Sequence, residues 1–236
     1  VYAWVKVDGR EFGLKPLYDK RLLAELLRLS LWSMLHAFIS VAPWFLFFVA
    51  IERLGEVQLA VSNIIRSVST VFFVIVNSFA ATTGALVSNL IGAGERRLLF
   101  PLCRKIVKLG YAIGFPLIVL AACFHRQIAG LYTDSTRLIE MSAVPFIVML
   151  FNYVFALPGY VYINAVTGTG KTRTAFLFQL TTIAVYLAYL YLLSRYAGVP
   201  LAVYLMAEYL FVILLAIQSV LYLRASSQHF LFQVEA

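Results

Sequence analysis

Six apolar stretches, each long enough for a membrane-spanning helix, dominate this sequence of 236 residues. They cover residues 29–51, 59–90, 106–124, 143–166, 174–193 and 199–223. A helix crosses the hydrocarbon core of a bilayer with about 20 predominantly apolar residues. Runs such as residues 115–124 lack the in–out alternation of a transmembrane β-strand. The sequence therefore predicts an all-α, polytopic transmembrane bundle of six helices.

The composition excludes most other classes of protein. Hydrophobic residues make up 62% of the chain and charged residues 13%, against about 45–50% and about 25% in soluble domains. A soluble enzyme, a disordered chain and a fibrous protein are therefore excluded. A disulfide scaffold is excluded too, because Cys103 and Cys123 lie roughly 30 Å apart if they share one helix.

The net charge of +8 reflects orientation in the membrane rather than binding of nucleic acid. In the predicted topology, fourteen Lys and Arg residues lie on the side of the termini, four lie on the other side, and Arg66 lies inside a span. Positive residues concentrate on the cytoplasmic side, so we expect both termini there. We expect a multi-pass protein of a bacterial cytoplasmic (inner) membrane, with the lipid bilayer as a partner and no nucleic acid.

No polar linker divides the apolar region, which predicts one membrane domain. We expect a cytoplasmic connection over residues 1–25, a six-helix membrane lobe over residues 26–224 and a cytoplasmic tail over residues 225–236. Several aromatic side chains near the predicted span ends, Trp44 among them, are typical of anchors at the membrane interface.

A polar stripe in the second span is the strongest functional signal. Helical spacing aligns the residues Ser62, Asn63, Arg66, Ser69, Thr70 and Asn77 on one face. A charge in hydrocarbon costs at least about 2.5–3.5 kcal/mol, so this face meets protein or water. Two interpretations stay open: the wall of a hydrophilic translocation cavity, with Asn63, Arg66 and Ser69 as substrate contacts, or a buried network that joins helices.

Two further ionisable residues lie inside spans. Glu208 is a candidate for coupling to a cation, or the partner of an arginine such as Arg66. His36 has Ser33 and Ser40 on neighbouring turns and is a second coupling candidate or a hydrogen-bonded core histidine.

The fourth span combines polar side chains with a helix breaker. Asn152 and Tyr153 are candidate substrate contacts, and Pro158 with Gly159 predicts a hinge or kink. Broken helices bend around the substrate site in many transporters, although static kinks are common in membrane helices as well.

Residues 165–172 (AVTGTGKT) resemble a phosphate-binding P-loop with Ala165 in the first glycine position. That loop needs a preceding strand and an acidic residue for Mg²⁺. Here a membrane span precedes it, and no aspartate ends a strand-like run. We therefore expect no ATP binding, no cofactor, no metal site and no catalytic residue.

The same segment resembles a loop of the multidrug and toxin extrusion (MATE) family. Residues 168–172 (GTGKT) are similar to its "GTG-x-T" loop, and residues 86–94 (LVSNLIGAG) to its "LVSN-x-IGAG" segment. Residues 131–134 (LYTD) and the pairs Leu54–Gly55 and Leu59–Ala60 resemble two of its external loops. The matches follow the order and spacing of the family across about residues 26–224.

The resemblance implies the C-terminal six-helix half of a twelve-helix transporter, with an N-terminal lobe as the missing partner. It implies a secondary antiporter that exports drugs or other organic solutes in exchange for H⁺ or Na⁺ by alternating access. One branch of the family binds its cation with acids of the seventh and tenth spans. The corresponding spans here contain no acid, so coupling would use Glu208, the absent half or another arrangement.

Three alternatives remain open. A lipid-linked oligosaccharide flippase of the same superfamily would favour several arginines in the cavity, where this half supplies Arg66. A membrane-embedded enzyme would need a nucleophile–base pair or metal ligands, and the sequence shows no such cluster. A helical structural subunit would lack a water-accessible stripe.

Overall fold

The computed structural model describes residues 19–196 and 198–234, without some side chains of the first helix or those of residues 227–234. The described chain consists of helices and turns, with no strand among these residues. The helices are α2 (Lys20–Glu52), α3 (Glu56–Gly92), the short 3₁₀ helix η1 (Arg96–Leu98), α4 (Leu99–Cys123), α5 (His125–Gly130), α6 (Thr136–Gly168), α7 (Thr172–Ser194) and α8 (Leu201–Val234).

Five described helical segments are long and apolar enough to cross a membrane, which agrees with five of the six predicted spans. They are Glu56–Gly92, Arg96–Cys123, Thr136–Gly168, Thr172–Ser194 and Leu201–Ser226. The other predicted span, residues 29–51, is helical within α2, where the described side chains include the shorter apolar stretch Pro43–Glu52. The protein is therefore an all-α polytopic membrane bundle, as predicted.

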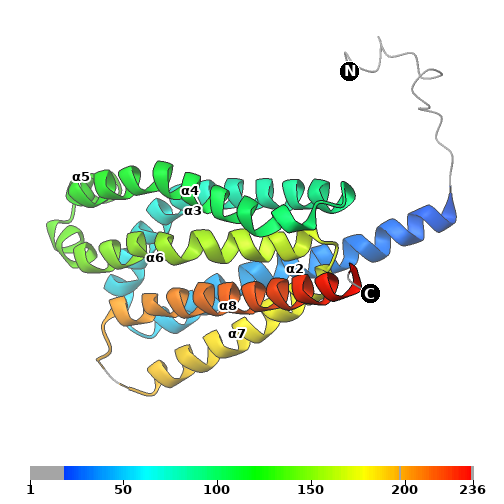
Figure 1. Cartoon of the computed structure of the whole chain (residues 1–236). Coiled ribbons are helices and arrows are strands. Elements are labelled where there is room, and N and C mark those ends of the chain that lie inside the picture. The colour runs from blue at the N-terminus through cyan, green and yellow to red at the C-terminus, as the bar shows by residue number, and fades with distance from the viewer. Residues whose placement is uncertain (1–18, 197, 235–236) are drawn as a thin grey trace, which may run out of the picture.

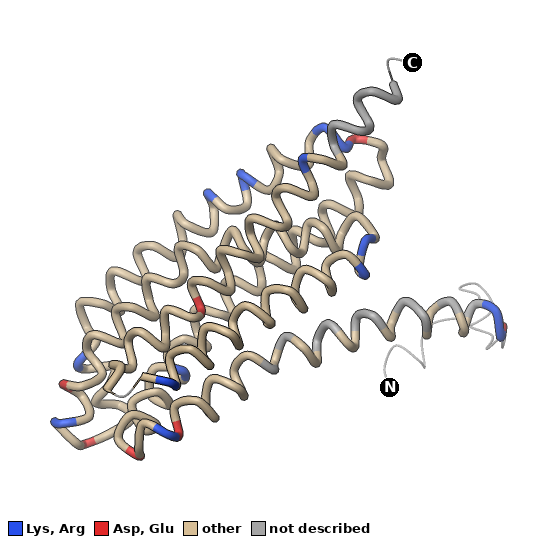
Figure 2. Tube along the Cα trace, turned by 90° about the horizontal axis from the view of Figure 1, so that it is seen from below, with Lys and Arg blue, Asp and Glu red and all other residues tan. Residues whose placement is uncertain are grey.

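Helix α6 is the centre of the bundle. It packs against α3, α4, α5, α7 and α8, and Figure 1 shows it lying between α4 and α8. Its buried residues extend from Ser142 to Val166 and cover most of the helix surface, while Val144, Ile147 and Phe151 form an exposed face. In contrast, α2 packs mainly against α7, and its first half extends beyond the other helices (Figures 1 and 2).

Small residues allow α3 and α6 to approach closely. A Cβ added at Gly168 would lie 2.5 Å from the carbonyl oxygen of Gly84, which is closer than atoms can pack. The Ser88 hydroxyl donates a hydrogen bond of 2.9 Å to the carbonyl of Gly168. The small-residue run that includes Gly84 therefore serves helix packing, as small residues commonly do in membranes.

Two tyrosines join α4 to α6 in a reciprocal pair. The Tyr153 hydroxyl of α6 donates to the Gly110 carbonyl of α4 at 2.9 Å. The Tyr111 hydroxyl of α4 donates to the Val154 carbonyl of α6. Gly114 must lack a side chain here, because a Cβ would lie 2.2 Å from the Tyr153 hydroxyl oxygen.

The charged residues gather at the two ends of the bundle. Figure 2 shows the Lys and Arg positions clustered there, with a long, mostly uncharged middle. This distribution fits a bundle whose middle lies in hydrocarbon. The predicted domain boundaries at residues 25/26 and 224/225 both fall inside helices, because α2 begins at Lys20 and α8 continues to Val234.

The contact between Gly168 and Gly84 predicts the effect of a single methyl group. Gly168→Ala forces α6 away from the backbone of α3, and we expect a loss of about 1–3 kcal/mol in stability. Thermal unfolding of the purified protein in detergent measures this loss. Gly92→Ala is the matched control, because a Cβ there meets nothing within 4 Å. Equal melting temperatures for the two variants would contradict the close contact.

Candidate functional site

A cavity of about 570 Å³ opens among α2, α3, α6, α7 and α8. Most of its walls are aromatic or aliphatic, with polar groups contributed by α3, α6, α7 and α8. It is lined by Val41, Trp44, Arg66, Ser69, Thr70, Phe72, Phe73, Val76, Asn77, Met149, Asn152, Tyr153, Ala156, Tyr160, Ile163, Asn164, Gln179, Glu208, Val212 and Leu215. Apolar walls with a few convergent polar groups are typical of small-molecule sites.

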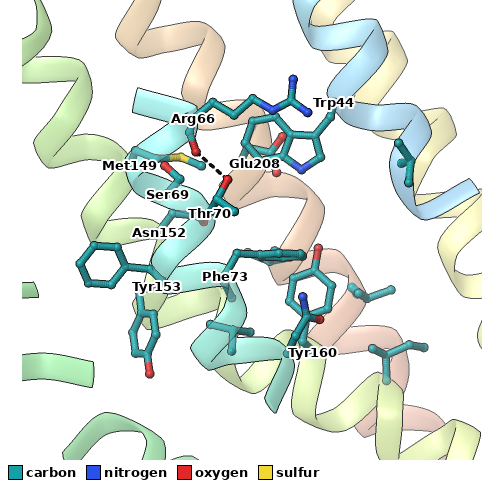
Figure 3. A pocket seen from close by; sticks show the side chains of 18 of the residues that line it. Trp44, Arg66, Ser69, Thr70, Phe73, Met149, Asn152, Tyr153, Tyr160 and Glu208 are labelled. Atoms are coloured by element: carbon teal, nitrogen blue, oxygen red, sulfur yellow. Dashed lines mark hydrogen bonds between the residues drawn. The ribbon is translucent and has the colours of Figure 1, made fainter. Parts of the chain in front are cut away.

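The polar stripe of α3 forms one wall of this cavity. Arg66, Ser69, Thr70 and Asn77 line it, and Figure 3 shows Arg66, Ser69 and Thr70 along the same helix. Ser69 and Thr70 donate their hydroxyl protons to the helix's own carbonyls, at 2.6 Å and 2.9 Å. These hydroxyls therefore offer acceptor lone pairs, rather than donors, to the cavity.

The other two members of the predicted stripe do not line the cavity. Ser62 is buried and donates to the Gln58 carbonyl within α3. Asn63 is exposed, one turn before Arg66, and is not among the lining residues. The predicted substrate contact at Asn63 thus lies outside the cavity in this conformation.

Arg66 is held by aromatic rings. Its guanidinium carbon lies 5.0 Å from the centroid of the Phe48 ring and 5.7 Å from that of Trp44. Cation–π contacts of this kind stabilise by about 0.5–2 kcal/mol. Within the described part of the chain, no acidic side chain forms an ion pair with Arg66, so its charge is available to the cavity.

Glu208 is buried against α7 rather than paired with Arg66. Only 6% of its surface is exposed, and the Tyr186 hydroxyl lies 3.1 Å from its Oε1 atom. The same hydroxyl lies 3.4 Å from the carbonyl oxygen of Pro43 in α2. Among the described residues, Glu208 and Arg66 form no ion pair, so the alternative in which they are partners has no support in this conformation. Tyr186 instead connects α8, α7 and α2.

The two predicted contacts on α6 behave differently. Asn152 lines the cavity with 7% of its surface exposed, and its Oδ1 atom is buried with no described hydrogen-bond partner. Tyr153 also lines the cavity, but its hydroxyl is used in the contact with Gly110 and points away from Arg66 in Figure 3. Asn152 is therefore the polar group of the pair that a solute would meet.

The predicted hinge lies beside the cavity, within a continuous helix. Helix α6 runs through Pro158 from Thr136 to Gly168. Gly159 packs on α8, where a Cβ would lie 2.8 Å from the Val212 carbonyl oxygen. Neither residue lines the cavity. The backbone of His36 lies in α2, but its side chain is outside the described part of the structure.

Three aromatic contributions to the site were not expected. Trp44, predicted as an interface anchor, lines the cavity beside Arg66. Phe73 packs edge-to-face on Tyr160, with ring centroids 5.3 Å apart. Tyr186 carries no sequence signal, because its span is rich in similar apolar and aromatic residues. The helical spacing of Phe73 with Arg66 and Thr70 was the available signal for that ring.

Long apolar helices around a cavity with a few convergent polar groups are typical of a polytopic membrane protein of the transporter class. The sequence model of the MatE family matches residues 33–192. The chain therefore belongs to the MATE family, as its loop motifs predicted. This is a family of transporters rather than enzymes.

Solved MATE structures share the fold. A MATE in complex with MaL6 is 20% identical with a TM-score of 0.76, and the match covers 89% of this chain and 48% of that one. An outward-facing multidrug resistance MATE transporter of the MOP superfamily is 19% identical with a TM-score of 0.76, covering 90% and 48%. A MOP superfamily transporter from Pyrococcus furiosus is 14% identical with a TM-score of 0.69, covering 83% and 42%.

The chain therefore spans about half the length of the solved transporters it matches. No curated protein sequence matches it.

Because the stripe of α3 lines an open cavity, we predict that water reaches its side chains. In a variant without native cysteines, we expect Ser69→Cys to react with a membrane-impermeant maleimide, because Ser69 lines the open cavity. Val68→Cys, on the same helix turn but only 7% exposed, is the control and should react far more slowly. Mass spectrometry measures the labelled fraction. Equal protection of both cysteines would indicate a dry packing interface.

Proposed function

We propose that this chain is one lobe of a cation-coupled antiporter that exports drugs or other organic solutes in exchange for H⁺ or Na⁺. The observation that carries the proposal is the cavity itself. It brings an arginine without an ion-pair partner among the described residues and a buried glutamate together within membrane-spanning helices. Ionisable groups at such depth are costly and are usually retained for function.

Alternating access is the proposed mechanism. A half-length lobe with an open cavity fits a transporter in which two lobes enclose the solute and rock around it. The aromatic walls, including Trp44, Phe73 and Tyr160, would bury the apolar body of the solute. The N-terminal lobe of the same protein is the partner we propose for the open side.

We propose Glu208 as the coupling group, with Tyr186 as its relay. A tyrosine hydroxyl has one proton to donate. When Glu208 is a carboxylate, Tyr186 donates that proton to it across 3.1 Å. When Glu208 is protonated, the carboxyl can donate to Tyr186, whose own proton then turns to the Pro43 carbonyl at 3.4 Å. Protonation would thus reverse the hydrogen bond between α8 and α7 and direct the proton of Tyr186 to α2.

The surroundings of Glu208 support this role. Arg66 of α3, Tyr153 and Tyr160 of α6, and Tyr186 of α7 are the described titratable side chains at the cavity or in contact with Glu208. Because no described cationic side chain pairs with the carboxyl, H⁺ or Na⁺ is the cation that we propose to neutralise it. The low number of lining arginines gives less support to a flippase for a polyanionic lipid.

We also propose that the protein lies in a bacterial inner membrane, with both ends of this segment on the cytoplasmic side. The end of the bundle with Arg96, Arg97, Arg104, Lys105, Lys171, Arg173 and Arg224 carries more basic residues than the end with Arg53, Arg126, Arg137 and Arg195. Such an asymmetry sets topology through the retention of Lys and Arg on the cytoplasmic side.

The coupling role predicts the phenotype of Glu208→Gln. The amide preserves shape and a hydrogen bond to Tyr186 but cannot exchange a proton. In proteoliposomes with the complete transporter, we expect efflux of a dye such as ethidium driven by a cation gradient to fall to the level of protein-free vesicles. Solute exchange without a gradient should persist.

Glu140→Gln is the matched control, since Glu140 is exposed near the start of α6 and does not line the cavity. It should leave both activities unchanged. Gradient-driven efflux that survives Glu208→Gln at the normal rate would refute the coupling role.

A further inference from the structure

A second concave site lies outside the transport cavity, where the end of α3 meets the start of α4. It is a groove of about 360 Å³ with almost entirely apolar walls. It is lined by Leu86, Asn89, Leu90, Ala93, Leu98, Pro101, Leu102 and Lys105. Four of these residues belong to the segment 86–94 that the MATE motifs identify.

That segment has two faces with different roles. Its inner face packs on α6, where Val87 is fully buried and Ser88 bonds to Gly168. Its outer face, with Leu86 and Asn89, is exposed and lines the groove. Packing on α6 accounts for the inner face, whereas Leu86 and Asn89 on the outer face stay exposed at the groove.

The groove carries one charge, at Lys105. This side chain is exposed and forms no ion pair with any described residue. Arg96 and Arg97 of η1 and Arg104 of α4 are exposed as well, against one exposed acid in the segment 95–105, Glu95. The mouth of the groove is therefore net positive, while its walls are apolar.

We propose that this groove binds an anionic membrane phospholipid. The apolar walls from Leu86 to Leu102 would hold an acyl chain, and the Lys105 ammonium would bind the phosphate. Lys105 lies about 9 Å into α4 from its first residue, and a lysine side chain of this kind reaches out to headgroup level. The bound lipid would bridge α3 and α4 on the side opposite the Gly168 contact.

The chemistry favours an anionic lipid over a zwitterionic one. Each basic residue near the membrane surface contributes about 1 kcal/mol to the binding free energy of anionic lipid. A zwitterionic headgroup carries its own cation, which the positive mouth of the groove would repel. The proposal does not depend on the transport function or on which side of the membrane the groove faces.

Native mass spectrometry of the purified protein tests the site. The protein is titrated in detergent with phosphatidylglycerol and, separately, with phosphatidylcholine of the same chains. We expect phosphatidylglycerol to bind more tightly, and Lys105→Gln to weaken it about fivefold. Lys108→Gln is the control, because Lys108 is exposed on α4 but does not line the groove. An equal loss of phosphatidylglycerol affinity in both lysine variants would overturn the proposed site, because it would indicate a non-specific effect of net charge.

Two further experiments distinguish the contribution of the acyl chain to binding from that of the headgroup. Ala93→Leu fills the groove from an exposed position and should weaken phosphatidylglycerol binding while Lys105 is intact. Glycerol 3-phosphate also carries an anionic phosphate, as a monoester and without chains, and should not raise the melting temperature. Unchanged lipid binding in Ala93→Leu, or stabilisation by glycerol 3-phosphate that Lys105→Gln abolishes, would overturn the lipid proposal.

Discussion

The close approach of α6 to its neighbours is the constraint on which the rest of the structure depends. In hydrocarbon, helices gain little from burying apolar surface, so packing of small residues must hold them together. Gly168 meets the backbone of Gly84 in α3, Gly159 meets Val212 in α8, and Gly114 accommodates Tyr153 between α4 and α6. These contacts fix α3 and α8 on either side of α6, and the cavity forms between them.

That arrangement determines what the polar residues can do. Because α3 and α8 both contact α6, Arg66 and Glu208 face one cavity without forming an ion pair in the described structure. Arg66 rests on aromatic rings, and Glu208 bonds to Tyr186. Each side chain therefore has a local partner that a solute or a proton could displace, which supports the coupling that we propose. In that proposal, the relay through Tyr186 would extend the effect to α2.

Much of this could be predicted from the sequence, and the limits have physical causes. The spans follow from local hydropathy, and five of the six are described as long apolar helices. The stripe follows from the helical period, and four of its six members line the cavity, whereas Ser62 and Asn63 do not. The roles of Trp44 and Tyr186 depend on which helices cross, and the sequence of one helix carries no record of its neighbours. Asn63 has the period of the stripe but lies one turn nearer the start of α3 than Arg66, where the lining of the cavity by α3 begins.

Cation-coupled exchange is the central claim, and the movement of the cation tests it most directly. In proteoliposomes with the complete transporter, ethidium is added outside while an internal pH dye and ²²Na⁺ report H⁺ and Na⁺. If exchange is coupled, ethidium entry drives one of these cations out in a fixed ratio. Ethidium entry through the protein without movement of either cation would contradict coupled exchange.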